Sequence, residues 1–309
     1  MFEIHTSDFD PCPARAKLRR DGRFDGVAGT ALVRGISIHN ALETLHNSPE
    51  ESAVAAVADG VAKCMAELEE QGRSPSDAVL NNTSALSKEL AEAAVRYREQ
   101  VMPICENWTL LGTEVPVYYQ LRDDVHLSSH IDILFVDSDG RARAWDWKWR
   151  VQAPSAFSDL ARHLQLACYW AALADGGLVQ TTLRAKGWIQ EGDNWCRVPE
   201  GSALPELSWV DLPSLKPYAR ATIGKDSSGK AVQYKKGDCR PIDRIIRTPQ
   251  FHLNQLDAIK EAALLRADLL INDMAPFIPQ GCSHCECEPW CPRFDIAENK
   301  LYNDVKVDF

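Results

Sequence analysis

The sequence contains no apolar run long enough to cross a membrane. Among its 309 residues, no stretch approaches the roughly 20 consecutive apolar residues that a transmembrane helix needs. The first residues, MFEIHTSDFD, also lack the basic and apolar regions of a secretory signal peptide. These two absences predict a cytoplasmic protein without a membrane partner.

Further absences limit the function classes. The sequence has no G-x-x-x-x-G-K-[ST] motif, so any helicase motor that works with it would be a separate partner protein. It has no internal repeat and no low-complexity segment. Basic residues are fewer than acidic ones, 34 against 44, and the net charge of −10 argues against a general nucleic-acid coat. A nuclease with a local basic surface stays compatible with this charge, and basic residues do gather at 15–23 and 216–247.

The ten cysteines are unevenly distributed. Four of them lie in CSHCECEPWCP at 282–292, and Cys12 precedes a proline near the N-terminus. In a reducing compartment, clustered cysteines indicate a metal site more often than a disulfide. A tetrahedral zinc site made from the four C-terminal cysteines is one interpretation.

Hydrophobic periodicity predicts an α/β chain. Residues 35–110 are expected to be helical, with Ser48 capping a helix that starts at Pro49 and ends near Gly72. Beyond residue 108 the pattern changes to the period of two that is typical of strands. The other expected elements are strands at 110–121, 125–137 and 141–151, helices at 84–101, 156–174 and 251–273, a hairpin at 185–198 and a mobile loop at 222–240.

The segment HIDILFVDSDGRARAWDWKW at 130–149 carries the candidate chemistry. Alternate residues of a strand share a face. The three tryptophans are therefore expected to face a buried layer, and Asp146 and Lys148 to face the other side. A turn at 137–140 is expected to bring Asp132, in the preceding apolar strand, close to Asp146.

Two neighbouring carboxylates repel each other unless they are protonated or share a cation. Carboxylate oxygens suit Mg²⁺ or Mn²⁺. A lysine beside such an ion can position or deprotonate a water, or can stabilise developing negative charge. The segment therefore points to metal-dependent phosphodiester hydrolysis, although a surface Asp–Lys pair at strand spacing would give the same D-x-K triplet.

Four short motifs follow one another along the chain: GISIHNALE at 35–43, IDIL at 131–134, WDWK at 145–148 and QLACY at 165–169. In these motifs and their order the chain resembles the PD-(D/E)XK nuclease superfamily, specifically its RecB-like branch. The resemblance implies a single α/β domain over 1–309 with the restriction-endonuclease-like fold. That fold has a mixed central sheet flanked by helices, and here it would carry a helical insertion at about 45–110.

The same resemblance implies roles for individual residues. The implied ligands of Mg²⁺ or Mn²⁺ are His39, Asp132, Asp146 and the main-chain carbonyl of Trp147. The implied catalytic residues are Asp132, Asp146, Lys148, Gln165 and Tyr169. Lys148 would assist the attacking water, whereas Gln165 and Tyr169 share one helical face and would orient the nucleic-acid strand. Glu114 and His130 would be accessory residues, the latter standing where relatives usually have glycine shortly before the first aspartate.

The segment SDFDPCPARAKL at 7–18 resembles the opening of the iron–sulfur RecB-like nucleases, such as the AddB nuclease domain and the CRISPR-associated exonucleases. In those proteins one N-terminal and three C-terminal cysteines hold a [4Fe–4S] cluster. The resemblance implies the ligands Cys12, Cys282, Cys285 and Cys291, with Cys287 as a bystander. The cluster would close a latch at about 275–295 onto the N-terminal segment and stabilise the domain. Zinc in the cysteine site stays the alternative.

Together these observations predict a DNA nuclease. The resemblance favours an exonuclease that acts on single-stranded DNA or free ends in a bacterial or phage-infected cell. Its partners would then include a helicase or other proteins of DNA repair, phage recombination or CRISPR adaptation. Two alternatives stay open: a non-catalytic module of the same fold that binds DNA ends or a partner, and a zinc-stabilised nucleic-acid-binding protein.

Overall fold

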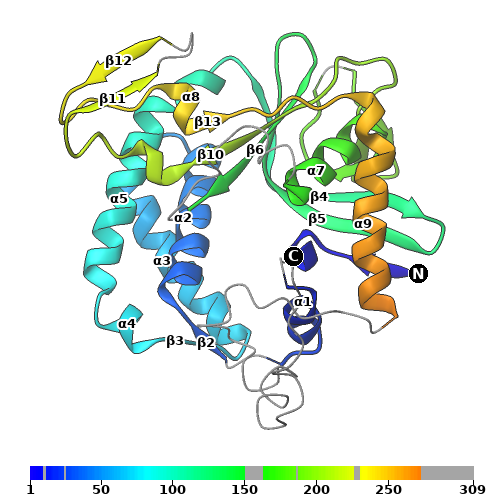
Figure 1. Cartoon of the computed structure of the whole chain (residues 1–309), viewed down its shortest axis with the longest axis horizontal. Helices are drawn as coiled ribbons and strands as arrows, with labels where there is room; N and C mark the ends of the chain where they lie inside the picture. The colour runs from blue at the N-terminus through cyan, green and yellow to red at the C-terminus, as the bar shows by residue number, and fades with distance from the viewer. Residues whose placement is uncertain (10–11, 24–25, 150–162, 186, 226–229, 273–309) are drawn as a thin grey trace, which may run out of the picture.

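The computed structural model describes residues 1–9, 12–23, 26–149, 163–185, 187–225 and 230–272, and a mixed β-sheet forms the centre of this part (Figure 1). Along the sheet the strands are β13 (Ile246–Arg247), β10 (Glu206–Asp211), β6 (Ala142–Lys148), β5 (Val125–Val136), β4 (Thr109–Arg122), β7 (Leu178–Gln180), β9 (Trp195–Arg197) and β8 (Ile189–Glu191). A further strand, β1 (Phe2–Ile4), pairs with β5. Strand β10 pairs with β6 in parallel. Strand β5 pairs antiparallel with both β4 and β6.

Helices cover both faces of the sheet. One face packs against α2 (Thr30–Asn47), α3 (Ala53–Glu70) and α5 (Thr83–Gln100). The other packs against α1 (Pro13–Arg20), α7 (Leu164–Ala174) and α9 (Leu256–Ile271). Figure 1 shows the two groups of helices on opposite sides of the molecule. The predicted fold class, a mixed central sheet flanked by helices, is confirmed.

Short elements complete the described chain. They are η1 (Thr6–Phe9), β2 (Val27–Ala28), β3 (Ser74–Pro75), α4 (Asp77–Leu80), η2 (Met102–Cys105), η3 (Leu212–Leu215), β11 (Thr222–Lys225), β12 (Ala231–Tyr234), α8 (Ile242–Ile245) and η4 (Leu253–Gln255). None of the helices within the described ranges combines the length and the hydrophobicity of a membrane span.

Aromatic packing fixes the orientation of β6. Trp145 and Trp147 are buried on the side of α2, α3 and α5, as the alternation of the strand predicts. The indole N–H of Trp147 donates to the Tyr97 hydroxyl at 3.0 Å, and the ring of His46 stacks on the indole with 5.9 Å between ring centroids. With the tryptophans held on this side, Asp146 is held on the opposite side of the strand.

Strand β5 changes its neighbour along one edge. Strand β1 pairs with Val125–Leu127, and β6 pairs with Ile133–Val136. Since β4 follows β5 along its other edge, residues 128–132 face a gap between β1 and β6. Ser129 and Asp132 lie in this gap, where the strand edge leaves room for side chains from other elements.

One predicted helix start is wrong. The helix expected to begin at Pro49 begins at Ala53, because Ser52 provides the cap and its Oγ accepts a hydrogen bond from the N–H of Ala55 at 3.1 Å. Ser48 instead closes α2, since its N–H donates to the carbonyl of Thr44. A serine does cap this helix, but the capping residue is Ser52, one turn after the predicted Ser48.

The mobile loop predicted at 222–240 is also wrong, because β11 and β12 form an antiparallel hairpin there. The ring of Tyr234 packs directly on Gly224 and stacks on the ring of Tyr218, with 4.8 Å between centroids. The other predicted elements are present: the hairpin at 185–198 is β8–β9, and the helix at 251–273 is α9. For the helix predicted at 156–174, the described part is α7, and residues 150–162 lie outside the described ranges.

Candidate nuclease site

Helix α2 presents His39 to the sheet. The Nε2 atom donates a hydrogen bond to the main-chain carbonyl of Trp147 at 2.8 Å. The Nδ1 atom lies 3.7 Å from Oδ2 of Asp132 and 3.9 Å from Oε1 of Glu114. Burial opposes a charge on the ring, but the two carboxylates outweigh burial and raise the pKa of His39. The two carboxylates therefore lie on the Nδ1 side of the ring.

Asp132 lies at the centre of the site. Its side chain is 9% exposed, and its Oδ2 accepts a hydrogen bond from the main-chain N–H of Trp147 at 2.6 Å. Burial raises the pKa of this carboxyl, His39 lowers it, and the charge of Asp146 raises it again, so that the net shift is upward. A raised carboxyl pKa here means that burial and the charge of Asp146 together outweigh the favourable effect of His39 on the ionised form.

Glu114 has an unusual backbone conformation on β4. It lies across from Asp132 on the neighbouring strand. Its φ of 46° is the only positive value among the described residues other than glycine. Conformations of this kind cost about 1–3 kcal/mol and concentrate at functional sites. The strain therefore indicates that Glu114 belongs to the site and is more than sheet scaffold.

Asp146 and Lys148 form an ion pair at the end of β6. The Nζ atom of Lys148 donates to Oδ1 of Asp146 at 2.7 Å. Burial opposes the ammonium charge, but Asp146 and Asp132 outweigh it and raise the pKa of Lys148. Lys148 therefore carries a positive charge at neutral pH and places a hydrogen-bond donor next to the two aspartates.

The hydroxyl of Tyr169 connects α7 to the N-terminal segment. Gln165, one turn earlier, donates from Nε2 to this hydroxyl at 3.1 Å. The hydroxyl also lies 3.2 Å from both Thr6 Oγ1 and Ser129 Oγ, which are themselves 2.6 Å apart. Burial, reinforced by two nearby aspartates, raises the pKa of Tyr169 to about 12. The phenol therefore keeps its proton and remains a hydrogen-bond donor.

Thr6 and Ser129 were not among the site residues predicted from the sequence. Thr6 is separated from Ser129 by 123 positions and from Tyr169 by 163. Contacts over such distances leave no periodic or motif signal. The one available signal was Ser129 itself, a small polar residue beside the position where the resemblance expects glycine.

The donor set of the site fits a divalent cation. One ligand atom from each of His39, Glu114 and Asp132 lies within 4.8 Å of the other two. Imidazole nitrogen and carboxylate oxygen suit Mn²⁺, and the oxygens suit Mg²⁺. Glu114, predicted as accessory, thus joins two predicted ligands, whereas Asp146 lies outside this trio and pairs with Lys148.

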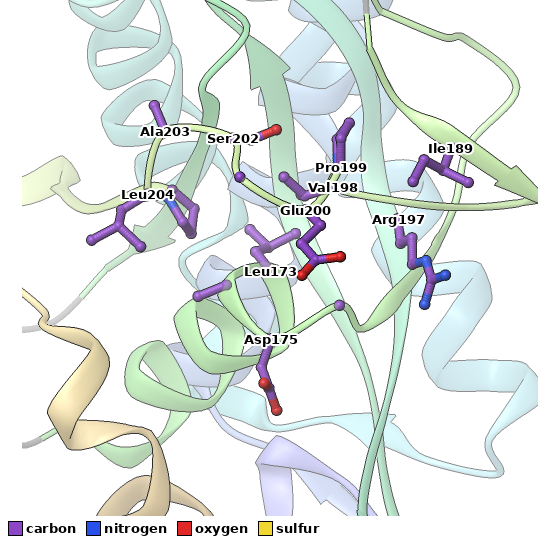
Figure 2. A pocket seen from close by; sticks show the side chains of 14 residues that line it. Leu173, Asp175, Ile189, Arg197, Val198, Pro199, Glu200, Ser202, Ala203 and Leu204 are labelled. Atoms are coloured by element: carbon purple, nitrogen blue, oxygen red, sulfur yellow. The ribbon is translucent and has the colours of Figure 1, made fainter.

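Two cavities differ in their relation to these residues. A cavity of about 550 Å³ is lined by α2, including His39, and by three glutamates, Glu43, Glu67 and Glu114. Another, of about 370 Å³, lies at the C-terminal end of α7 and contains none of the predicted site residues (Figure 2). The acidic cavity therefore gives access to His39 and Glu114 of the candidate site.

Two other predicted residues are described but do not belong to the ligand group of His39, Glu114 and Asp132. His130 is exposed on β5. Cys12 is buried, 7% exposed, at the start of α1. The C-terminal cysteines 282, 285, 287 and 291, and the latch predicted at about 275–295, lie outside the described residues.

Comparison with known proteins agrees with this geometry. The family model of the PD-(D/E)XK nuclease superfamily matches residues 5–292. No curated protein gives a match. The matched range includes Thr6, His39, both aspartates and the Gln165–Tyr169 pair, so it spans every element of the site. The chain therefore belongs to the PD-(D/E)XK nuclease superfamily, whose chemistry is metal-dependent hydrolysis of phosphodiester bonds.

Proposed function

We propose that this chain is a metal-dependent DNA nuclease and that its active site is the cluster of His39, Glu114, Asp132, Asp146 and Lys148. The observation that carries the proposal is the charge balance of the cluster. Three carboxylates gather there, and Asp132 is buried with a raised pKa although His39 and Lys148 are close. A divalent cation would supply the missing charge.

In this proposal His39, Glu114 and Asp132 hold the cation, together with the main-chain oxygen of Trp147. A bound Mg²⁺ or Mn²⁺ supplies Lewis acidity toward the phosphate and lowers the pKa of a water. The ammonium of Lys148, held beside the two aspartates, acts as a stabiliser of phosphate charge. Asp146 orients the ammonium group through the 2.7 Å contact.

Tyr169 and Gln165 position the substrate strand. Since Gln165 donates to the Tyr169 oxygen, and since this phenol keeps its proton, the hydroxyl hydrogen can be given to an acceptor such as a phosphate oxygen. Thr6 and Ser129 also hold the hydroxyl in place, each through a hydrogen bond. We assign these two side chains a positioning role.

The RecB-like resemblance supports an exonuclease that acts on single-stranded DNA or free ends. A labelled linear single strand and a closed circular single strand of equal length separate the two modes of cleavage. An exonuclease shortens the linear strand and leaves the circle intact, whereas an endonuclease opens the circle.

We further propose that Cys12 joins Cys282, Cys285 and Cys291 in a [4Fe–4S] cluster. In support, Cys12 is buried at the start of α1, next in sequence to the segment whose Thr6 contacts Tyr169. A cluster that ties the C-terminal segment to Cys12 would therefore also hold Thr6 beside the site.

Iron and sulfide analysis after anaerobic purification tests this second proposal. Cys12→Ser should lose iron and thermal stability together, whereas Cys287→Ser should keep both. A colourless parent protein that contains zinc would exclude the iron–sulfur cluster and favour the zinc site.

The nuclease proposal is tested by cleavage of end-labelled single-stranded DNA in Mn²⁺, with the parent chain, Lys148→Ala and the control Lys63→Ala. Lys63 is an exposed residue of α3. Loss of a charge stabiliser should slow cleavage by about 10²–10³-fold in Lys148→Ala only. A parent that binds DNA without cutting it would favour the non-catalytic module, and equal rates in parent and Lys148→Ala would remove Lys148 from the reaction.

A further inference from the structure

One segment of this acidic chain has the opposite charge. Residues 216–247 contain nine basic and three acidic side chains, whereas the whole chain carries −10. The basic residues are Lys216, Arg220, Lys225, Lys230, Lys235, Lys236, Arg240, Arg244 and Arg247. A local excess of positive charge in an acidic protein indicates an anionic partner for that surface.

The segment begins beside the candidate nuclease site. Strand β10 runs parallel to β6, and its last residue, Asp211, pairs with Lys148. After the short η3 turn, the ammonium of Lys216 lies 5.9 Å from the ring centroid of Trp149, the residue that follows Lys148. A second cation, Arg34 of α2, lies over the same ring at 5.7 Å. The basic segment therefore starts at the end of the strand that carries Asp146 and Lys148.

An aromatic stack supports the next part of the segment. Tyr218 stacks on Tyr234 of β12 with 4.8 Å between centroids, and the guanidinium of Arg240 lies 5.5 Å from the Tyr218 ring. Main-chain hydrogen bonds join Tyr218 to Asp238 and Gly237 to Tyr218 at 3.0 and 2.8 Å. These contacts give a defined conformation to a two-stranded hairpin, which would be only marginally stable by itself.

The hairpin contributes little to the hydrophobic core. Ile223 on β11 is 77% exposed, and Figure 1 shows β11 and β12 extending beyond α5 and α8, away from the central sheet. Arg220, Lys235 and Lys236 are exposed and make no ion pair with any described residue. Exposed cations that have no acidic partner within the described ranges can neutralise phosphates.

We propose that residues 216–225 and 230–240 form a basic arm that binds the phosphate backbone of the DNA substrate and guides it to the site at Lys148. This proposal rests on the proposed nuclease function and adds to it the surface that holds the substrate outside the metal cluster. The arm binds by charge and reads no sequence, since the groups that would contact DNA are the side chains of Arg220, Lys235 and Lys236.

Binding of a fluorescent single-stranded DNA, followed by anisotropy without added divalent metal, tests the arm separately from cleavage. The test variant is Lys235→Ala/Lys236→Ala, and the matched control is Lys63→Ala/Lys88→Ala, which removes two exposed charges from α3 and α5. Loss of two phosphate contacts should weaken binding by about tenfold and reduce the slope of log K against log salt by about 1.4. The control should bind as the parent does.

Cleavage kinetics of the same proteins complete the test. The arm variant should show a raised KM with an unchanged kcat, because the arm lies outside the reacting groups. Equal DNA affinity and equal salt slope in the arm and control variants would overturn the arm proposal, whatever the parent cleaves, and would leave an acidic protein as the partner of this surface. If the parent binds DNA through the arm but does not cut it, the arm proposal is supported and the nuclease proposal is contradicted.

Discussion

Asp132 of β5 and Asp175, which caps the C-terminal end of α7, differ in how their charges are balanced. Asp175 follows the last residue of α7 at the cavity of Figure 2, where Lys260 Nζ is 2.5 Å away and the Tyr119 hydroxyl donates to it at 2.7 Å. Burial is the largest single effect and opposes its charge, but these two partners together outweigh burial and lower its pKa. At Asp132 the nearest cationic group is 3.7 Å away and the pKa is raised.

The difference separates a structural carboxylate from a candidate ligand. At Asp175 the protein supplies its own cation, so the ion pair joins α7 to α9 and the site needs nothing further. At Asp132 the protein places other carboxylates close by and supplies less positive charge than they require. Charge balance is thus the feature that distinguishes the proposed metal site from Asp175.

Cleavage should show the largest contrast. Asp132→Asn should slow Mn²⁺-dependent DNA cleavage by about a thousandfold or more, because one ligand of the cation and its negative charge are lost. Asp175→Asn should leave the rate within about threefold of the parent, since ion pairs of this exposure contribute little. The measurement is kcat/KM on end-labelled single strands. A comparable loss in both variants would mean that the effect is structural.

Metal-dependent stabilisation should show the next largest contrast. At a cation concentration of 100 times Kd, a site that exists only in the folded state stabilises the protein by about 2.7 kcal/mol. Thermal unfolding should therefore shift upward by several degrees on addition of Mn²⁺ in the parent and in Asp175→Asn, and should not shift in Asp132→Asn. An unchanged shift in Asp132→Asn would place the cation elsewhere.

The hydroxyl network should have a smaller effect on the rate. Ser129→Ala removes one of the groups that hold the Tyr169 hydroxyl, and kcat should fall by about tenfold while KM changes little. Ser208→Ala is the matched control, since Ser208 is also buried and its Oγ lies 2.7 Å from Thr248 Oγ1, outside the site. A rise in KM without loss of kcat would argue against a role in positioning Tyr169 for the reaction.

The smallest effect is expected in the pH dependence of stability. The lowered pKa of Asp175 contributes stability above the unfolded pKa of about 3.9, and this stability is lost as the pH falls through the folded pKa. Asp175→Asn should therefore lower the free energy of unfolding by about 1 kcal/mol or less at neutral pH. It should also weaken the loss of stability between neutral and acidic pH. The raised pKa of Asp132 acts in the other direction.

Without divalent metal, folded Asp132 holds a proton that the unfolded chain has released, so stability falls as the pH rises from about 3.9 to the folded pKa. Asp132→Asn should flatten this decline. Urea unfolding of the metal-free proteins between pH 3 and pH 8 measures both effects. If both variants changed the stability in the same pH range and in the same direction, the opposite charge balance of the two sites would be contradicted.

The side-chain orientations in β6 were predictable because they depend on local periodicity. Trp145 and Trp147 alternate with Asp146 and Lys148, so the buried face and the chemical face follow from the period of two. The hairpin turn at 137–140 then brings Asp132 to the same end of the sheet, and the turn is present, with the N–H of Gly140 donating to Asp137.

Other parts of the site depend on contacts that no local pattern encodes. The positive φ of Glu114 has no local signal, because glutamate has no special preference for that conformation. Thr6 reaches Tyr169 only because β1 pairs with β5 and brings the N-terminal segment to the gap in the strand edge. The charge balance of Asp175 and Lys260 likewise exists only after α7 and α9 have packed together.

Mn²⁺ binding, measured by calorimetric titration of the parent, Asp132→Asn and Asp175→Asn in the absence of DNA, tests the central claim most directly. The charge deficit at Asp132 predicts saturable binding in the parent and in Asp175→Asn, and loss of that binding in Asp132→Asn. Binding of equal affinity in all three proteins would contradict the assignment of the cation to His39, Glu114 and Asp132.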